Sequence, residues 1–112
     1  MNPEAVVRRQ LEAYNARDLQ RFLAEYGEDI RAYRPPAAAP TLAGKKAFGE
    51  FYATQRFNRI ELRAELLGRM VLGRIVIDHE RISGVSERPF EVAVVYEVVD
   101  GLIQCTWTYA PE

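Results

Sequence analysis

Cysteine, histidine and long apolar runs are scarce in this chain of 112 residues. Cys105 is the only cysteine, so neither an intrachain disulfide nor a cysteine-based metal cluster can form. His79 is the only histidine, and no ligands cluster at metal spacing, so we expect no metal and no cofactor. No apolar run approaches the roughly 18 residues of a membrane span, and the N-terminal stretch lacks the apolar core of a signal peptide. We therefore expect a cytoplasmic protein without a membrane partner.

An excess of charge of one sign is also lacking. Fifteen Lys and Arg residues face sixteen Asp and Glu residues, which gives a net charge of -1. A protein that follows nucleic-acid phosphates needs a basic face, so we expect no nucleic-acid partner. Apolar residues make up 48% of the chain, which predicts a single globular domain over residues 1–112 with one core and room for a small cavity.

The first half of the chain carries helix signals. Asn2-Pro3 predicts an N-cap followed by a first-turn proline, and apolar residues recur at helical spacing from Val7 to Tyr14. Asp18 is expected to cap a second short helix, which Gly27 would end. A short strand, DIRAYR, ending at Pro35-Pro36, and a third helix around Phe48 should follow.

The second half changes to strand spacing. Apolar and charged residues alternate from Ile60 to Leu66, and three further strands are predicted at about Arg74–Ser83, Phe90–Val99 and Leu102–Tyr109. Asp100-Gly101 is a strong hairpin signal between the last two. The later strands should therefore be antiparallel, which predicts an α+β fold with the helices first and a curved sheet after them.

Four short motifs occur in order along this pattern: YNARDL, YGEDI, LAGKKAF and DGLI. Together they resemble the nuclear-transport-factor-2-like superfamily, and more narrowly its SnoaL-like polyketide-cyclase and ketosteroid-isomerase-like branch. The resemblance implies a cone of curved antiparallel β-sheet packed on N-terminal helices, a small-molecule pocket at the open end, and dimerisation through the outer sheet face. The superfamily includes enzymes of several classes and non-catalytic binders, so the fold alone does not give the function.

The catalytic positions of the resembled enzymes hold other residues here. Ketosteroid isomerases use a tyrosine, an Asp that acts as the general base, and a protonated Asp. By the resemblance, these three positions fall on Gln10, Arg34 and Val95. An arginine stays protonated near neutral pH and cannot act as a base. In the epoxide-hydrolase branch, Ser83 and Thr108 stand where two Asp residues would be. We expect neither mechanism; if the chain is an enzyme, the resemblance implies an isomerase or lyase with different catalytic residues.

The segment IVIDHERISG raises the question of a proton-transfer site. Side chains alternate between the two faces of a strand, so Asp78 and Glu80 cannot share a face with His79. By the resemblance to the hydrolases, His79 and Arg81 face the pocket, and the two acids face outward. His79 and Arg81 are then the candidate catalytic residues, although a structural role is favoured for His79.

Two hypotheses of different classes follow. The first is a domain that binds a small, mostly apolar molecule with a carboxylate or carbonyl group; its candidate ligand contacts are Arg34, His79, Arg81, Tyr14, Gln10 and Thr108. The second is a non-catalytic homodimeric interaction domain whose cavity is filled by its own aromatic side chains. A homodimer is expected in both cases, because alternate residues from Phe90 to Val98, with Trp107 and Tyr109, would form an apolar patch that monomers rarely expose.

Overall fold

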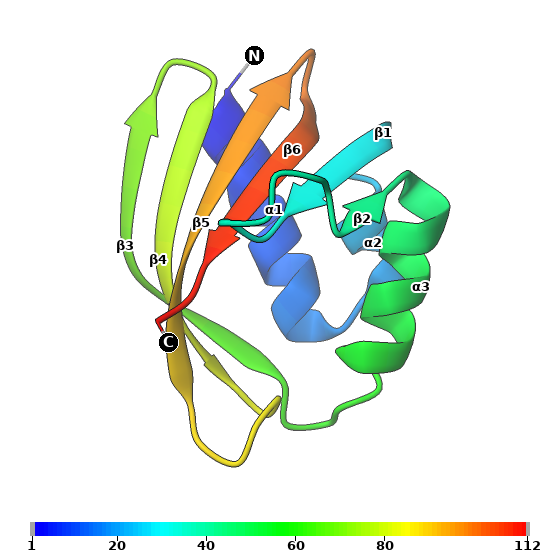
Figure 1. The fold of residues 1–112 in the computed structure, drawn as a ribbon, viewed down its shortest axis with the longest axis vertical. Helices are drawn as coiled ribbons and strands as arrows, with labels where there is room; N and C mark the ends of the chain where they lie inside the picture. Colours follow the sequence, from blue (N-terminus) through cyan, green and yellow to red (C-terminus); the bar gives the residue numbers. More distant parts are fainter. Residues whose placement is uncertain (1, 112) are drawn as a thin grey trace.

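The computed structural model describes residues 2–111. The N-terminal half contains α1 (Pro3–Ala16), α2 (Leu19–Leu23), β1 (Tyr26–Tyr33), β2 (Leu42–Ala43) and α3 (Lys45–Gln55). The C-terminal half contains β3 (Arg63–Leu72), β4 (Ile75–Ser83), β5 (Phe90–Val99) and β6 (Leu102–Tyr109). The α+β class and the order of helices before the main strands are confirmed (Figure 1).

Two helices begin at the residues that the sequence predicts. The Asn2 side chain accepts hydrogen bonds from the backbone N–H groups of Glu4 and Ala5, at 3.0 and 3.4 Å. The Asp18 side chain accepts one from the Arg21 N–H at 3.2 Å. These bonds satisfy amide groups that the first turn of a helix leaves without partners, and so they fix where α1 and α2 start.

The second helix ends before Gly27, so that part of the prediction is wrong. α2 ends at Leu23, and Gly27 lies inside β1. A Cβ atom at Gly27 would collide with the side chain of Gln104 on β6. Gly27 therefore lies in a strand, where the end of the Gln104 side chain packs over it, and does not end a helix.

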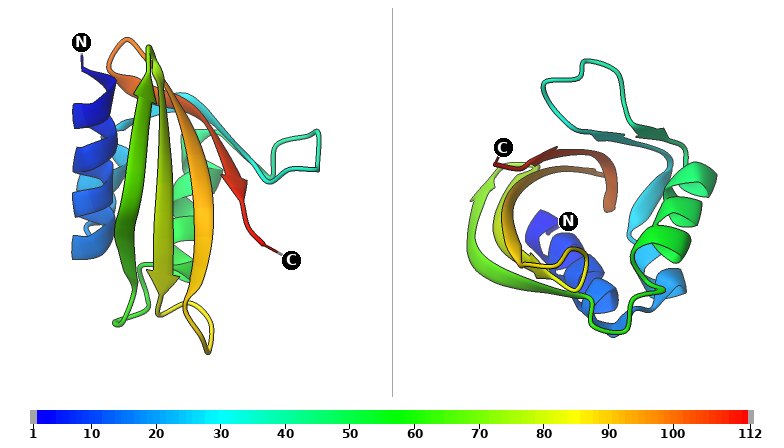
Figure 2. Two further views of the ribbon diagram at one scale, coloured as in Figure 1. Left: turned by 90° about the vertical axis from the view of Figure 1, so that its left-hand side faces the viewer. Right: turned by 60° about the horizontal axis from the view of Figure 1, so that its bottom comes forward.

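The six strands form one open, curved sheet in the order β2-β1-β6-β5-β4-β3. The β1–β6 pair is parallel, and the others are antiparallel. Asp100 and Gly101 both have positive φ, 53° and 78°, as a type I′ hairpin turn requires, so the predicted β5–β6 hairpin is confirmed. The sheet curls around α1, with α2 and α3 across the opening of the curve (Figure 2).

The third strand starts later than expected. β3 begins at Arg63, and Ile60 lies before it with 80% of its surface exposed. A register shift between Leu66 and Gly68 then interrupts the strict alternation of faces.

The inner face of the sheet carries the core. For both β4 and β5, the sequence analysis assigned the inner and outer faces the wrong way round. On β4, Asp78 and Glu80 are buried, whereas His79 is exposed. On β5, the alternate residues from Val92 to Val98 are buried, so they are core residues and not an exposed patch. The register pairs Asp78 with Val94, which places these two inner rows side by side.

An aromatic cluster occupies the space between the helices and the sheet. The ring of Phe22 lies 4.8 to 6.0 Å, centroid to centroid, from five other rings. These belong to Tyr14, Tyr26, Phe48, Tyr52 and Phe57. Rings of this size bury large apolar areas, so they narrow the space that is left inside the cone.

Candidate functional site

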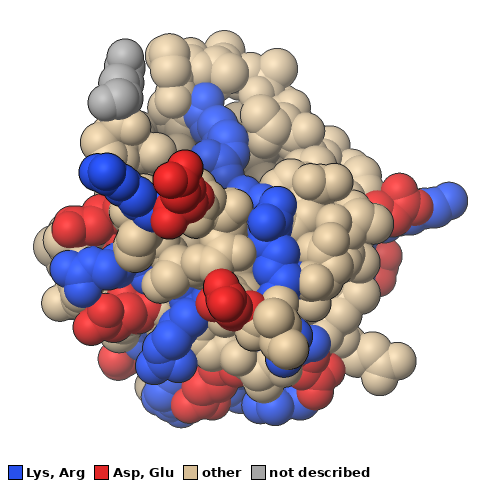
Figure 3. All heavy atoms as spheres, turned by 90° about the horizontal axis from the view of Figure 1, so that it is seen from below, with Lys and Arg blue, Asp and Glu red and all other residues tan. Residues whose placement is uncertain are grey.

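A cavity of about 80 Å³ lies inside the cone, between α1, α3 and the inner face of β4 to β6. An apolar cavity of about 150 Å³ is known to hold benzene, so this one admits only a short ligand. Its apolar lining includes Leu11, Phe22, Ile82, Val92 and Val94. Figure 3 looks onto the lower end of the molecule, where basic and acidic side chains are interspersed.

Four of the six predicted contact residues line this cavity. Gln10 and Tyr14 come from α1, Arg34 directly follows β1, and Thr108 lies near the end of β6. Gln10 is 3% exposed, whereas Arg34 is exposed to solvent and lies at the rim. That these four bind a ligand stays a prediction.

His79 and Arg81 lie on the outer face of the sheet, so the prediction that they face the cavity is wrong. His79 Nε2 lies 2.6 Å from Glu91 Oε1, and Arg81 contacts Glu65 at 3.0 Å. Each of these side chains is roughly half exposed. Together with Glu65 and Glu91 they form a row of polar contacts across β3, β4 and β5, away from the cavity.

Glu80 is the cavity residue that the sequence interpretation placed on the wrong face. It is 4% exposed, and its Oε2 atom accepts a hydrogen bond from the Tyr96 hydroxyl at 3.4 Å. The pKa of its carboxyl is raised from the ordinary 4.5 to about 7, mainly by burial and next by the charge of Asp78. A buried carboxyl with a pKa near neutrality can both take up and release a proton under physiological conditions.

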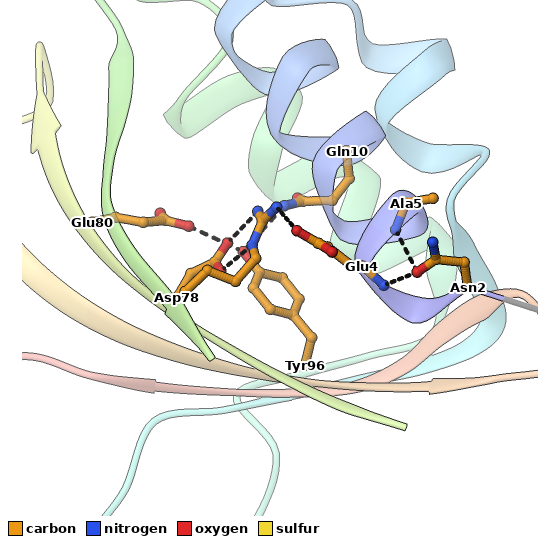
Figure 4. Close-up of polar contacts among 8 residues, drawn as sticks. Asn2, Glu4, Ala5, Gln10, Asp78, Glu80 and Tyr96 are labelled. Carbon is orange, nitrogen blue, oxygen red and sulfur yellow. Dashed lines mark hydrogen bonds and ion pairs between the residues drawn. The ribbon is translucent and has the colours of Figure 1, made fainter. Parts of the chain in front are cut away.

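A chain of hydrogen bonds fixes the orientation of Glu80. The Tyr26 hydroxyl donates to Gln10 Oε1 at 2.8 Å, and Gln10 Nε2 donates to the Tyr96 oxygen at 3.2 Å. The Tyr96 hydroxyl is thereby directed at Glu80. Figure 4 shows Gln10 reaching from α1 toward Tyr96 and the two acids of β4. The chain connects three strands and a helix, so the position of the carboxyl depends on the whole fold.

Asp78 lies next to Glu80 but has a different partner. Arg69 on β3 forms two hydrogen bonds with the Asp78 carboxylate, at 2.7 and 2.9 Å. Asp78 is fully buried, the Arg69 side chain is 10% exposed, and Glu4 lies 3.8 Å from Arg69. A bidentate contact of this kind is the geometry that compensates best for burying two charges.

Two arginines lie at the rim of the cavity, Arg34 and Arg56. Within residues 2–111, neither forms an ion pair with a carboxylate. Burial raises the pKa of the Tyr52 hydroxyl, whereas the charges of Arg56 and Arg34 lower this pKa and that of Glu80 raises it. Burial likewise raises the pKa of Tyr14, which also responds to Arg56 and Glu80. Both tyrosines therefore lie within electrostatic reach of a rim arginine and of Glu80.

Neither a metal site nor a membrane-spanning helix is found in the described part of the chain. Among residues 2–111, no three or more His, Cys, Asp or Glu side chains are grouped so that they could hold a metal ion. No helix within that range is long and apolar enough to cross a bilayer.

Comparisons with known proteins agree with this architecture. A proposed ketosteroid isomerase from Kribbella flavida has 20% identity and a TM-score of 0.86, over 98% of this chain and 78% of that one. An NTF2-like protein of unknown function from Cytophaga hutchinsonii has 12% identity and a TM-score of 0.85, over 99% and 91%. An epoxide hydrolase of the LEH-like type from Mycobacterium tuberculosis has 18% identity and a TM-score of 0.83, over 97% and 82%.

These identities are low, so the solved structures show a shared fold and not a shared reaction. A comparison with curated proteins finds no matching sequence. The model of the SnoaL-like domain family matches residues 7–105, which is most of the chain. The protein therefore belongs to the SnoaL-like domain family and has the nuclear-transport-factor-2-like fold.

Proposed function

We propose that this protein binds a small, mostly apolar molecule with a carboxylate or carbonyl group in the cavity of the cone. The observation that carries the proposal is the lining of the cavity, which combines apolar side chains with two arginines, Arg34 and Arg56, and the buried Glu80. An apolar pocket with a few convergent polar groups is the usual form of a small-molecule site. The Kribbella and Mycobacterium proteins, whose names denote enzymes of small molecules, have the same fold.

The two rim arginines favour a carboxylate over a neutral group. An arginine can hold a carboxylate through two parallel hydrogen bonds, and charged hydrogen bonds contribute roughly 1.5–3 kcal/mol each. Loss of one such contact should therefore weaken binding about tenfold to a hundredfold. The size of the cavity limits the apolar part of the ligand to a short chain.

Calorimetric titration tests this function with isobutyrate and 2-oxobutyrate as probes and the neutral isobutyramide as their counterpart. We expect the two acids to bind more tightly than the amide, and Arg34→Gln and Arg56→Gln to weaken the acids selectively. Arg81→Gln is the matched control, because Arg81 is an arginine on the outer face. Equal binding of acid and amide, or a loss of binding in Arg81→Gln alone, would contradict this assignment of the site.

A homodimer is the second part of the proposal, supported by a different set of residues from the one the sequence suggested. On the outer face of the sheet, the registers align five apolar side chains across five strands. They are Met70, Ile77, Val95, Trp107 and Tyr33. The rings of Trp107 and Tyr33 are stacked at 5.5 Å, and Met70 is 56% exposed. A second copy of the chain would remove this row from water.

The alternative of a non-catalytic interaction domain is supported by the small cavity and the same outer row. In that case dimerisation would be the function, and the acids named above would not bind. The titration distinguishes the two functions, since only the first predicts binding that depends on Arg34 and Arg56.

A further inference from the structure

Two buried carboxyl groups on the same strand have opposite surroundings. Asp78 is held by Arg69 through two hydrogen bonds. Within residues 2–111, Glu80 has no cation at ion-pair distance, and its neighbours are the Tyr96 hydroxyl and the Asp78 carboxyl. A pair of acids whose environments differ in this way is a recurring arrangement of acid–base sites in enzymes.

We propose that Glu80 is the catalytic acid–base group of this cavity, which moves a proton on the carbon next to the carbonyl of a short 2-oxo acid. The proposal rests on the binding function proposed above. It names a residue outside the catalytic positions of ketosteroid isomerases, which fall on Gln10, Arg34 and Val95 in this chain.

The step is balanced without any co-reactant. The ionised Glu80 carboxylate removes a proton from C3 of the acid. The C–H electron pair forms the C2–C3 double bond, and the carbonyl electron pair moves onto the C2 oxygen, which gives an enolate. Glu80, now protonated, returns a proton to C3, which restores the 2-oxo acid. In heavy water the Glu80 carboxyl exchanges its proton for a solvent deuteron, and return of that deuteron labels C3.

The order of groups along the cavity suits this step. The carboxylate of the acid is bound at the rim by Arg34 and Arg56, and Glu80 lies on the sheet side, with Tyr14 and Tyr52 within electrostatic reach of both. No side-chain hydrogen bond among residues 2–111 uses the hydroxyl of either tyrosine, and neither hydroxyl is a fully buried group left without a partner. Either hydroxyl can therefore donate to the enolate oxygen. The volume of about 80 Å³ restricts the acid to a short chain.

Glu80 titrates close to neutral pH because of the groups around it. Burial is the main cause of a pKa near 7, and the Asp78 charge adds to it, whereas the Tyr96 hydrogen bond and Arg69 lower this pKa. The charged and titratable groups that face Glu80 from the packed elements are Tyr14 on α1, Tyr26 on β1, Tyr52 on α3, Arg69 on β3, Asp78 on β4 and Tyr96 on β5. A base with a pKa near the working pH combines availability with proton affinity.

The experiment measures exchange of the C3 protons of pyruvate and 2-oxobutyrate in heavy water by proton NMR. We expect the wild-type protein to accelerate exchange over buffer, with a rate that rises with pH to a plateau above about pH 7. Glu80→Gln should lower the rate about a hundredfold or more, since acid–base groups contribute roughly 10² to 10⁴. Glu91→Gln is the matched control on the outer face, and it should exchange like the wild type.

Tyr96→Phe provides a second variant that does not depend on how Glu80→Gln folds. The substitution removes the Tyr96 hydroxyl and with it the hydrogen bond that lowers the Glu80 pKa. The pH at which the exchange rate rises should therefore shift upward. A merely structural role for Glu80 would leave this pH profile in place.

The outcomes separate the catalytic proposal from the binding proposal. Exchange in Glu80→Gln at the wild-type rate, or no shift in Tyr96→Phe, would overturn the role of Glu80. Binding of 2-oxobutyrate by the wild type without any exchange would also overturn it while leaving the binding function intact. If 2-oxobutyrate neither binds nor exchanges, the proposed binding function itself fails.

Discussion

Glu80→Gln should make the protein more stable at alkaline pH, in contrast to the usual effect of changing a buried residue. In the folded protein the pKa of Glu80 is about 7, against 4.5 for an ordinary glutamate. Between these two pH values the folded chain holds a proton that the unfolded chain has released. Folding therefore takes up a proton in this range, and stability falls as the pH rises.

The magnitude follows from the two pKa values. Each pH unit between them corresponds to 1.36 kcal/mol, so the full difference is about 3 kcal/mol. Relative to the ionised carboxylate, the protonated Glu80 carboxyl thus contributes about 3 kcal/mol to the free energy of unfolding. This stabilisation is fully present below pH 4.5 and is lost as the pH rises through 7. Glu80 is 4% exposed, so solvent screens the effect little. For a domain of this size, about 3 kcal/mol corresponds to roughly 10 °C in the melting temperature.

Glutamine has nearly the shape of a protonated glutamate and does not ionise. Between pH 5 and pH 8 the free energy of unfolding of the wild type should fall because of Glu80, whereas that of Glu80→Gln should lack this fall. The stability of the variant relative to the wild type should therefore rise by about 3 kcal/mol over that range. Glu91→Gln, whose carboxyl is about half exposed, should keep the wild-type slope.

Urea denaturation followed by circular dichroism at pH 5, 6, 7 and 8 measures these free energies. The decisive quantity is the difference between the wild type and Glu80→Gln as a function of pH. If the two curves run parallel, the Glu80 carboxyl is not held protonated by its surroundings, and the reasoning about the cavity is refuted.

Three further predictions concern the ion pair, the outer face and the reaction. Asp78→Asn should lower the free energy of unfolding by about 3 kcal/mol or more in urea at pH 7, because Arg69 is left buried without its partner; Glu65→Gln, which breaks an exposed pair, should change it by less than about 1 kcal/mol. Light scattering at micromolar concentration should show a dimer for the wild type and a monomer for Trp107→Glu, and a monomeric wild type would contradict the proposed interface. A spectrophotometric assay should detect no Δ5-3-ketosteroid isomerase activity above background, since the cavity of about 80 Å³ is too small for a steroid; turnover that a cavity mutation abolishes would contradict this.

Local signals in the sequence were sufficient for most of the fold. The caps at Asn2 and Asp18 and the turn at Asp100-Gly101 each act through backbone groups only a few residues away. The strands β4 to β6 were predicted almost to their ends for the same reason. Gly27 was misassigned because β1 forms by pairing with β6, which lies far along the chain.

The face of β4 could not be predicted from its own residues. Apolar side chains occupy both faces, with Ile75 and Ile77 outside and Val76 and Ile82 inside. Alternation then fixes which residues share a face but not which face is buried. The two acids are stable inside only because Arg69 and Tyr96 on neighbouring strands contact them, and these are long-range contacts that a single strand does not reveal.

The residues at the rim of the cavity likewise could not all be predicted from the local sequence. Arg34 was identified through a family resemblance, and the structure places it against the cavity. Arg56 was missed, because nothing near it in the sequence indicates that the end of α3 would reach the rim. One weak signal was available in the sequence: the aromatic residues Phe51 and Tyr52 favour packing of this helix against a core.

The two buried carboxyl groups, Asp78 and Glu80, differ in what they contribute to the stability of the fold. Asp78 has a buried cationic partner, and its removal would leave Arg69 with only the half-exposed Glu4 at 3.8 Å, so the fold accounts for Asp78. Glu80 lowers stability above pH 7, and a glutamine could still accept a hydrogen bond from Tyr96 without ionising. The stability of the fold thus gives no reason for an acid at this position. A buried titratable group that lowers stability and borders a cavity is a candidate for proton transfer to a ligand. Glu80, rather than the lone histidine, is therefore the residue to test for a catalytic function.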